Sequence, residues 1–168
     1  AIWATVALSI AYAIRWIIPY EPNQTLLISA AMMARYAVHV CLLIAWCISI
    51  QRRLTNRQVR NLLIAVGILM AFWLTVRTVK YELIADRTNP IGRYIWYSYY
   101  IPMVLIPLIG FFVVKYIDKP IDYNHPKWMN YLAIPAVLLL VLVFTNDLHQ
   151  SVFRFHKGIE LFDTQYQY

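Results

Sequence analysis

Charged residues are scarce in this chain: they make up only 14% of its 168 residues, whereas hydrophobic residues make up 61%. Soluble domains are about 25% charged and about 45–50% apolar. The shortage of charge therefore excludes a disordered, collagen-like or ordinary soluble protein. We expect an integral protein that crosses the inner or plasma membrane several times.

Cysteine is also scarce. Cys41 and Cys47 both lie within an apolar run, so the sequence offers neither a disulfide framework nor a thiolate metal site. The common catalytic signatures are absent as well: there is no Gly-rich phosphate loop, nucleophile elbow, metalloprotease helix or paired-cysteine motif. We therefore predict that this chain is not itself an enzyme.

Acidic residues number only eight, and all of them lie in loops or at the ends of apolar runs: Glu21, Glu82, Asp86, Asp118, Asp122, Asp147, Glu160 and Asp163. Pumps and ion-coupled transporters usually bind or relay their ion through an ionisable group inside the membrane. The lack of such a carboxylate disfavours a carboxylate-relay transporter.

Long apolar runs, by contrast, are plentiful. A helix needs about 20 mostly apolar residues to cross a hydrocarbon core about 30 Å thick. Counting such runs predicts an all-α polytopic bundle, one transmembrane domain over 1–168, with spans at 2–18, 25–50, 61–80, 94–117 and 129–145. Pro102 and Pro107 should kink the fourth span, and Pro135 lies near the start of the fifth. The short connections favour one compact bundle.

The basic residues lie mostly between the apolar runs, and the net charge is +7. We expect them to face lipid headgroups and to set the topology, so no nucleic-acid partner is predicted. The two sides carry similar numbers of them, but 51–60 holds four arginines and no acid. This density predicts a cytoplasmic loop at 51–60 and places the segment after 145 outside the cell.

Arg35 and His39 are the main polar residues within the span 25–50, and their i, i+4 spacing puts them on one helical face. They form either a buried polar pair that lines a ligand cavity, or a pair in which Arg35 reaches the outer headgroups while His39 bonds a neighbouring helix. His125, His149 and His156 all lie outside the apolar runs. A haem is therefore disfavoured, and we predict no cofactor and no metal.

Two further features lie at the predicted outer ends of the spans. Arg77 and Lys80, spaced i, i+3, could hold a carboxylate or phosphate or could anchor their helix at the interface. The aromatic run over 94–100 predicts a belt at the membrane surface, or alternatively the wall of a ligand pocket.

The polar residues Asn146, Asp147 and His149 follow the fifth span. In one interpretation they only end the helix, and Phe153 and Phe155 then contact the bilayer surface. In the other, they form an extracytoplasmic site at which Asp147 and His149 bind a ligand, a cation or a proton.

Four segments together resemble the N-terminal seven-transmembrane input region of bacterial sensor histidine kinases: 45–53, 72–74, 94–100 and 144–155. The most specific part is the Thr-Asn-x-Leu-His element that closes a helix beginning with Ile134 and Pro135. The family element often has two adjacent histidines, whereas here Gln150 follows His149.

The resemblance implies that the spans from 25 to 145 are the first four of that family, with 2–18 added ahead of them. It also implies further spans and a cytoplasmic kinase or other output module beyond Tyr168, so that this chain is the front part of a sensor in a two-component system. By itself the chain should not phosphorylate anything.

We therefore expect a membrane sensor whose partners are the lipid bilayer, an unknown small-molecule ligand, the output module and a second copy of the chain. Its expected ligand site is Asn146, Asp147 and His149, with Arg77 and Lys80 as anion partners. The alternative is a transporter or permease subunit in which the prolines mark broken helices around a substrate. A membrane enzyme that uses a histidine has the least support.

Overall fold

The computed structural model describes residues 25–80, 91–117, 119–120, 123, 126–155 and 166–167, and the isolated residues 6, 9 and 13; the side chains of 25–29, 154–155 and 166–167 are not described. The predicted span 2–18 lies outside the described residues apart from those three positions.

Apolar helices make up nearly all of the described chain. They are α2 (Thr25–Arg53), α3 (Arg57–Thr78), α4 (Ile91–Tyr97), α5 (Tyr100–Tyr116), the 3-10 helix η3 (Lys127–Leu132) and α6 (Ala133–Phe144). Four stretches are long and apolar enough to cross a membrane: Ala30–Arg53, Arg57–Thr78, Ile91–Tyr116 and Lys127–Phe144. The helical prediction is therefore confirmed for four of the five runs.

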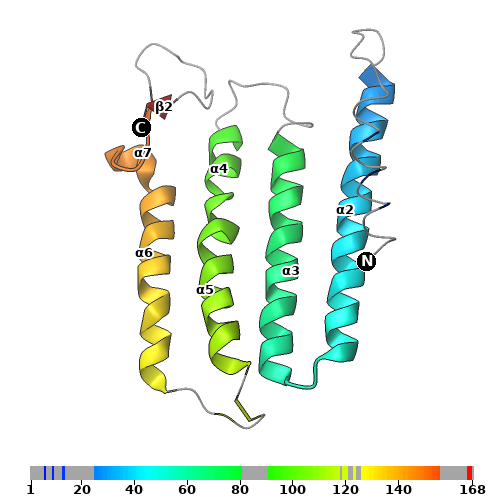
Figure 1. Cartoon of the computed structure of the whole chain (residues 1–168). Coiled ribbons are helices and arrows are strands. Elements are labelled where there is room, and N and C mark those ends of the chain that lie inside the picture. Colours follow the sequence, from blue (N-terminus) through cyan, green and yellow to red (C-terminus); the bar gives the residue numbers. More distant parts are fainter. Residues whose placement is uncertain are drawn as a thin grey trace.

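The remaining described elements are short. Helix α7 (Asn146–His149) follows α6, and a two-residue strand β1 (Arg154–Phe155) pairs antiparallel with β2 (Tyr166–Gln167). These elements lie at the same end of the molecule as the start of α4 (Figure 1).

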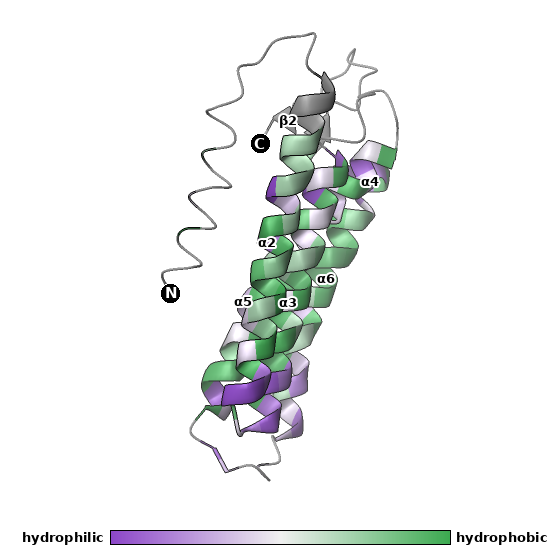
Figure 2. Ribbon diagram, turned by 90° about the vertical axis from the view of Figure 1, so that its right-hand side faces the viewer, coloured by the Kyte–Doolittle hydropathy of each residue, from purple (hydrophilic) through white to green (hydrophobic). Residues whose placement is uncertain are grey.

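The long helices stand side by side in a row. The main packing contacts join α2 to α3, α3 to α5, and α5 to α6, and the two perpendicular views show a single layer (Figures 1 and 2). The described helices therefore form an open row instead of the expected compact bundle. Its faces carry exposed apolar side chains such as Ile68, Val114 and Leu138. Such surfaces would be costly in water, whereas a lipid bilayer would cover them without that cost.

Helices α2 and α3 approach each other closely at Gly67, which is buried. A Cβ atom at Gly67 would collide with the sulfur of Cys47 and lie 3.2 Å from the ring of Trp46. A small residue thus lets the two backbones approach, as small residues do between membrane helices.

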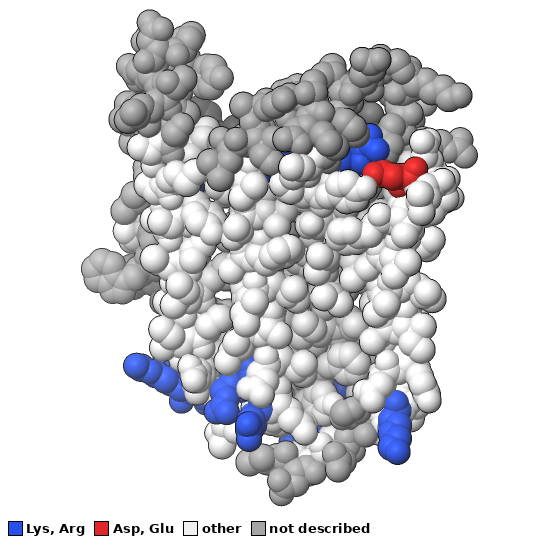
Figure 3. Space-filling view, turned by 180° about the vertical axis from the view of Figure 1, so that it is seen from behind, with Lys and Arg blue, Asp and Glu red and all other residues white. Residues whose placement is uncertain are grey.

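One end of the row carries the basic residues of 51–60 together with Lys115, Lys119 and Lys127, as the sequence predicted for a shared side (Figure 3). We call it the inner end, following the predicted topology, and the opposite end the outer end.

At the inner end the side-chain oxygen of Asn56 accepts from the backbone N–H groups of Gln58 and Val59, which caps α3. Its Nδ2 donates to the carbonyls of Tyr116 (3.3 Å) and Lys119 (3.5 Å). Asn56 therefore joins the start of α3 to the end of α5.

The fourth apolar stretch is interrupted at Ser98 and Tyr99, between α4 and α5. Pro102 has no N–H to give to the carbonyl of Ser98, and the N–H of Ile101 bonds that carbonyl instead at 3.3 Å. Where the sequence predicted a kink from Pro102, the structure has an interruption of the helix one turn ahead of the proline. Pro107, by contrast, lies inside the continuous α5.

Candidate functional site

Asn146, at the outer end, is fully buried and makes several hydrogen bonds. Its Oδ1 accepts from the N–H groups of Val152 (3.0 Å) and Phe153 (2.9 Å), and its Nδ2 donates to the carbonyl of Phe153 (3.0 Å). The same nitrogen lies 3.4 Å from the hydroxyl of Tyr97. All the donor and acceptor positions of the amide are used, so Asn146 holds the chain reversal that follows α7.

The chain reverses at Gln150, whose backbone has the left-handed conformation with a φ of 46°. This conformation ends α7 and directs the chain back toward α4. Phe153 is consequently buried among rings, with its centroid 4.8 Å from that of Trp96 and 5.3 Å from that of Tyr100. The interpretation in which Phe153 contacts the bilayer surface is wrong, because the protein covers it. Phe155 lies beyond the described side chains.

Asp147 is the only carboxylate among the residues that the structure describes. Its Oδ1 accepts from the guanidinium of Arg93 at 3.0 Å and from the hydroxyl of Tyr97 at 2.6 Å. Both charged side chains are largely covered, with exposed fractions of 21% and 26%. We call Arg93, Tyr97, Asn146 and Asp147 the outer polar cluster; it joins α4 to α7 across the top of the row.

The aromatic run at 94–100 packs mainly inside the protein. Trp96, Tyr97 and Tyr99 are buried, and only Tyr94 is strongly exposed. A surface belt is therefore the wrong interpretation for most of these rings, which instead pack around Phe153. Lys80 contacts this aromatic group, with its ammonium nitrogen 5.5 Å from the Trp96 ring centroid and 5.9 Å from that of Tyr99. Cation–π contact thus connects the residues just after α3 to the end of α4 and the interruption that follows it.

His149 is exposed, and both of its ring nitrogens are bonded locally. The N–H of Ser151 donates to Nδ1 at 3.0 Å. Thr145 gives its own hydroxyl proton to the carbonyl of Val141, so His149 Nε2–H donates to the Thr145 oxygen at 3.1 Å. These bonds hold the ring against its own turn and stabilise the turn. Of the predicted triad, Asn146 and Asp147 share a cluster, whereas His149 serves the loop beside it.

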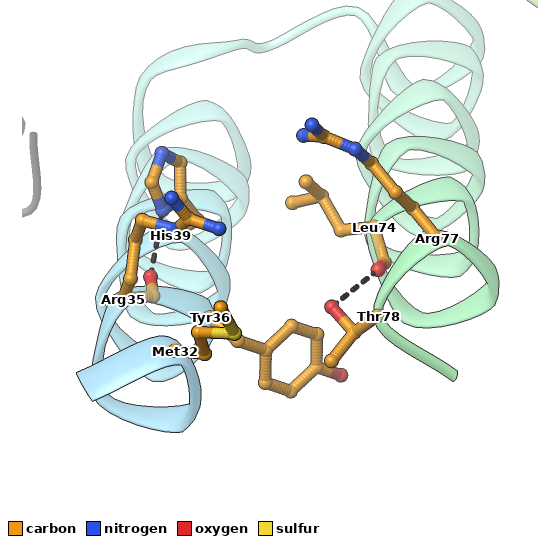
Figure 4. Close-up of a pocket in the computed structure, with 7 residues that line it drawn as sticks. All are labelled: Met32, Arg35, Tyr36, His39, Leu74, Arg77 and Thr78. Atoms are coloured by element: carbon orange, nitrogen blue, oxygen red, sulfur yellow. Dashed lines mark hydrogen bonds between the residues drawn. The ribbon is translucent and has the colours of Figure 1, made fainter. Parts of the chain in front are cut away.

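The remaining predicted residues lie on α2 and α3. Arg35, His39 and Arg77 line one cleft of about 100 Å³ between these helices, together with Met32, Tyr36, Leu74 and Thr78 (Figure 4). Arg77 also lines a wider cleft of about 250 Å³ with aromatic residues of α4 and α5. His39 Nδ1 donates to the carbonyl of Arg35 on its own helix at 2.7 Å, not to a neighbouring helix.

Arg93 and Tyr97 are the residues that the sequence interpretation missed. Their spacing of four places both on one face of α4, beside the only described carboxylate. The available signal was this i, i+4 pair of a cation and a phenol at the start of a span. It could not be connected to Asp147 without knowing that α4 and α7 meet.

The outer polar cluster consists of a carboxylate that accepts from both a guanidinium and a phenol, and the two charged side chains are only partly exposed to solvent. Within the described ranges, no group of three metal-binding side chains occurs. A polar ligand could compete for the bonds between Arg93 and Asp147, because charge-assisted bonds form equally well with carboxylates or cations from outside. No family model, curated protein or solved structure matches this chain.

Proposed function

We propose that the chain is a membrane-embedded sensory input region of a bacterial signal-transduction protein of the histidine kinase type. It detects a small ligand or an envelope condition at its outer end and relays it by helix movement to a cytoplasmic output module. The observation that supports this most strongly is the Arg93–Asp147 pair, which bridges α4 and α7 immediately before the break at Ser98 and Tyr99.

The Arg93–Asp147 bridge lies close to the helix break at Ser98 and Tyr99, so the outer end has two arrangements, one with the bridge closed and one with it open. With the bridge closed, α4 is held against the turn after α6. When a ligand takes Arg93 or Asp147 from its partner, α4 is released at a point where the backbone ladder is already interrupted. The signal is as large as the difference in the ligand's affinity for these two arrangements.

The inner end supplies a route for the relay. Helix α5 runs without interruption from Tyr100 to Tyr116, and the carbonyl of Tyr116 accepts from Asn56 at the start of α3. A shift of α5 along or across the row therefore acts on the start of α3. This is the side on which we expect the output module.

The proposal is tested in membrane vesicles from cells that express the full gene product, by measuring phosphate transfer from labelled ATP to the protein. A bridge worth about 1 kcal/mol changes a two-state ratio about fivefold. We therefore expect Asp147→Asn and Arg93→Gln to change the phosphorylation level about fivefold in the same direction. Leu148→Ala, which alters the exposed neighbour of Asp147, should leave it unchanged.

The opposite result would be the absence of any phosphate transfer, or transfer that is the same in Asp147→Asn, Arg93→Gln and the unaltered protein. The second candidate function, a transporter or permease subunit, is favoured by one observation, the interruption of a spanning helix about a third of the way along from its outer end. Solute flux into proteoliposomes that contain the chain, with no phosphate transfer in the full protein, would support the transporter instead.

A further inference from the structure

A cleft between α2 and α3 brings together basic side chains that are far apart in the sequence. Arg35 and His39 extend from α2, and Arg77 extends from α3 on the facing side (Figure 4). The cleft measures about 100 Å³. Drug-sized ligands occupy about 300–1,000 Å³, so this cleft accommodates only a small group.

The hydroxyl groups around the cleft are committed to the protein. Thr75 gives its proton to the carbonyl of Ala71, so Tyr36 donates its own to the Thr75 oxygen at 2.9 Å across the two helices. Thr78 likewise donates to the carbonyl of Leu74. The donors left for a ligand are the guanidinium groups of Arg35 and Arg77.

The charge of the cleft has one sign. Its lining holds two arginines and no acid, and the one carboxylate among the described residues, Asp147, pairs with Arg93. No ion pair within the described part of the chain includes Arg35 or Arg77. Two guanidiniums that face a common space at the edge of an apolar layer are stabilised by a shared anion.

The cleft also lies at a defined depth. A rise of about 1.5 Å per residue places Arg35 about 27 Å from Arg53 along α2, and Arg77 about 30 Å from Arg57 along α3. The hydrocarbon core is itself about 30 Å thick. With Arg53 and Arg57 at the inner boundary, the cleft is at the level of the outer headgroups.

We propose that this cleft binds one phosphate group, held between the guanidiniums of Arg35 and Arg77. A tetrahedral phosphate presents oxygen pairs toward two helices at once, whereas a single carboxylate satisfies one guanidinium fork. The phosphate belongs either to the headgroup of an anionic phospholipid or to a soluble phosphate ester. The proposal concerns a site apart from the outer polar cluster and does not rest on the signalling role.

The test measures binding to the purified chain in detergent by native mass spectrometry, with dioleoylphosphatidylglycerol as the probe. Dioleoylglycerol, which has the same acyl chains and no phosphate, is the matched ligand control. Arg35→Gln/Arg77→Gln removes the cleft cations. Arg52→Gln/Arg53→Gln removes the same charge from exposed positions at the inner end of α2 and is the matched variant control.

We expect one saturable phosphatidylglycerol per chain, bound about tenfold more weakly by Arg35→Gln/Arg77→Gln and within about twofold of the unaltered affinity by Arg52→Gln/Arg53→Gln. Dioleoylglycerol should show no saturable binding. Should the double variant fail to fold, Arg77→Gln alone, which changes an exposed side chain, is expected to weaken binding by more than the inner double variant does.

Competition with soluble glycerol 1-phosphate separates the two sources. Displacement of the lipid at millimolar concentrations supports a soluble phosphate ester, and retention of the lipid supports a headgroup. The proposal is overturned if Arg35→Gln/Arg77→Gln binds as the unaltered chain does, if the inner variant loses binding equally, or if dioleoylglycerol binds equally well.

Discussion

The two ends of the helix row are held together in different ways. At the outer end, the contact between α4 and α7 joins side chains to side chains: Asp147 accepts from Arg93 and Tyr97 next to an interrupted helix. At the inner end, Asn56 bonds to the backbone of α3, of the last residue of α5 and of Lys119 just after it. Bonds between charged side chains can be exchanged for bonds to a ligand, whereas bonds to a helix backbone persist while the helix does. In the proposed function, the outer end changes its arrangement and the inner end transmits the change.

The largest effect is expected from Asn146→Ala, which removes four bonds from a fully buried amide. Backbone groups of Val152 and Phe153 would lose their partner in a covered place, and the chain should lose about 3 kcal/mol of stability. Thermal unfolding in detergent, followed by circular dichroism, measures the loss. A change no larger than that of Leu148→Ala would show that the reversal is not held by this residue.

The next largest loss of stability is expected from breaking the Arg93–Asp147 pair at the outer end. A double-mutant cycle of Arg93→Gln and Asp147→Asn measures how much this pair contributes. The charge-assisted bond is mostly covered, so each single variant should cost about 1–2 kcal/mol and the coupling between them should be about 1 kcal/mol. Asp147→Asn keeps an oxygen acceptor for both Arg93 and Tyr97 and removes only the negative charge, so the cycle isolates the charge-assisted part of the guanidinium contact. Additive losses in unfolding experiments would mean that the pair contributes no energy of its own.

A smaller effect is expected from Asn56→Ala at the inner end, about 1 kcal/mol for the lost cap of α3. Asn56→Asp provides the matched control. It restores the acceptor for Gln58 and Val59 but cannot donate to Tyr116 or Lys119. Recovery of most of the stability by Asp would assign the loss to the cap, and no recovery would assign it to the contact with the end of α5.

The smallest effect should come from His149→Ala, below about 1 kcal/mol, because the ring is exposed and bonds only within its own turn. Phosphate transfer by the full gene product should also be nearly unchanged, in contrast to Asp147→Asn. If His149→Ala changed phosphate transfer as much as Asp147→Asn does, His149 would belong to the ligand site, as the sequence predicted.

The helices were predictable because they depend on local apolar runs. The bounds differ mainly at the ends: α3 begins at Arg57 instead of 61, since Asn56 caps it and the charged first turn extends past the apolar run. The break before Pro102 lies at Ser98 and Tyr99 because the Ser98 carbonyl accepts from Ile101 instead of from residue 102. Composition alone does not predict this change of hydrogen-bond partner.

The candidate site was predictable only in part. Asn146 and Asp147 were recognised as polar residues at a helix end, but their partners depend on which helices meet. Arg93 and Tyr97 lie about 50 residues earlier in the sequence, and their contact with Asp147 exists only because the turn at Gln150 and the packing of Phe153 hold α7 beside α4. The aromatic run was misinterpreted for the same reason, because its rings face a chain reversal that apolar periodicity does not reveal.

The relay from the outer to the inner end is tested most directly by the distance between spin labels at the inner end. Labels are placed at Gln51→Cys and Lys115→Cys, both exposed positions on α2 and α5, with Cys41 and Cys47 changed to serine. Asp147→Asn should move the mean distance in lipid nanodiscs by about 2 Å, the scale of ordinary helix shifts, while Leu148→Ala leaves it in place. An unchanged inner distance in Asp147→Asn, with the outer pair broken, would contradict the relay.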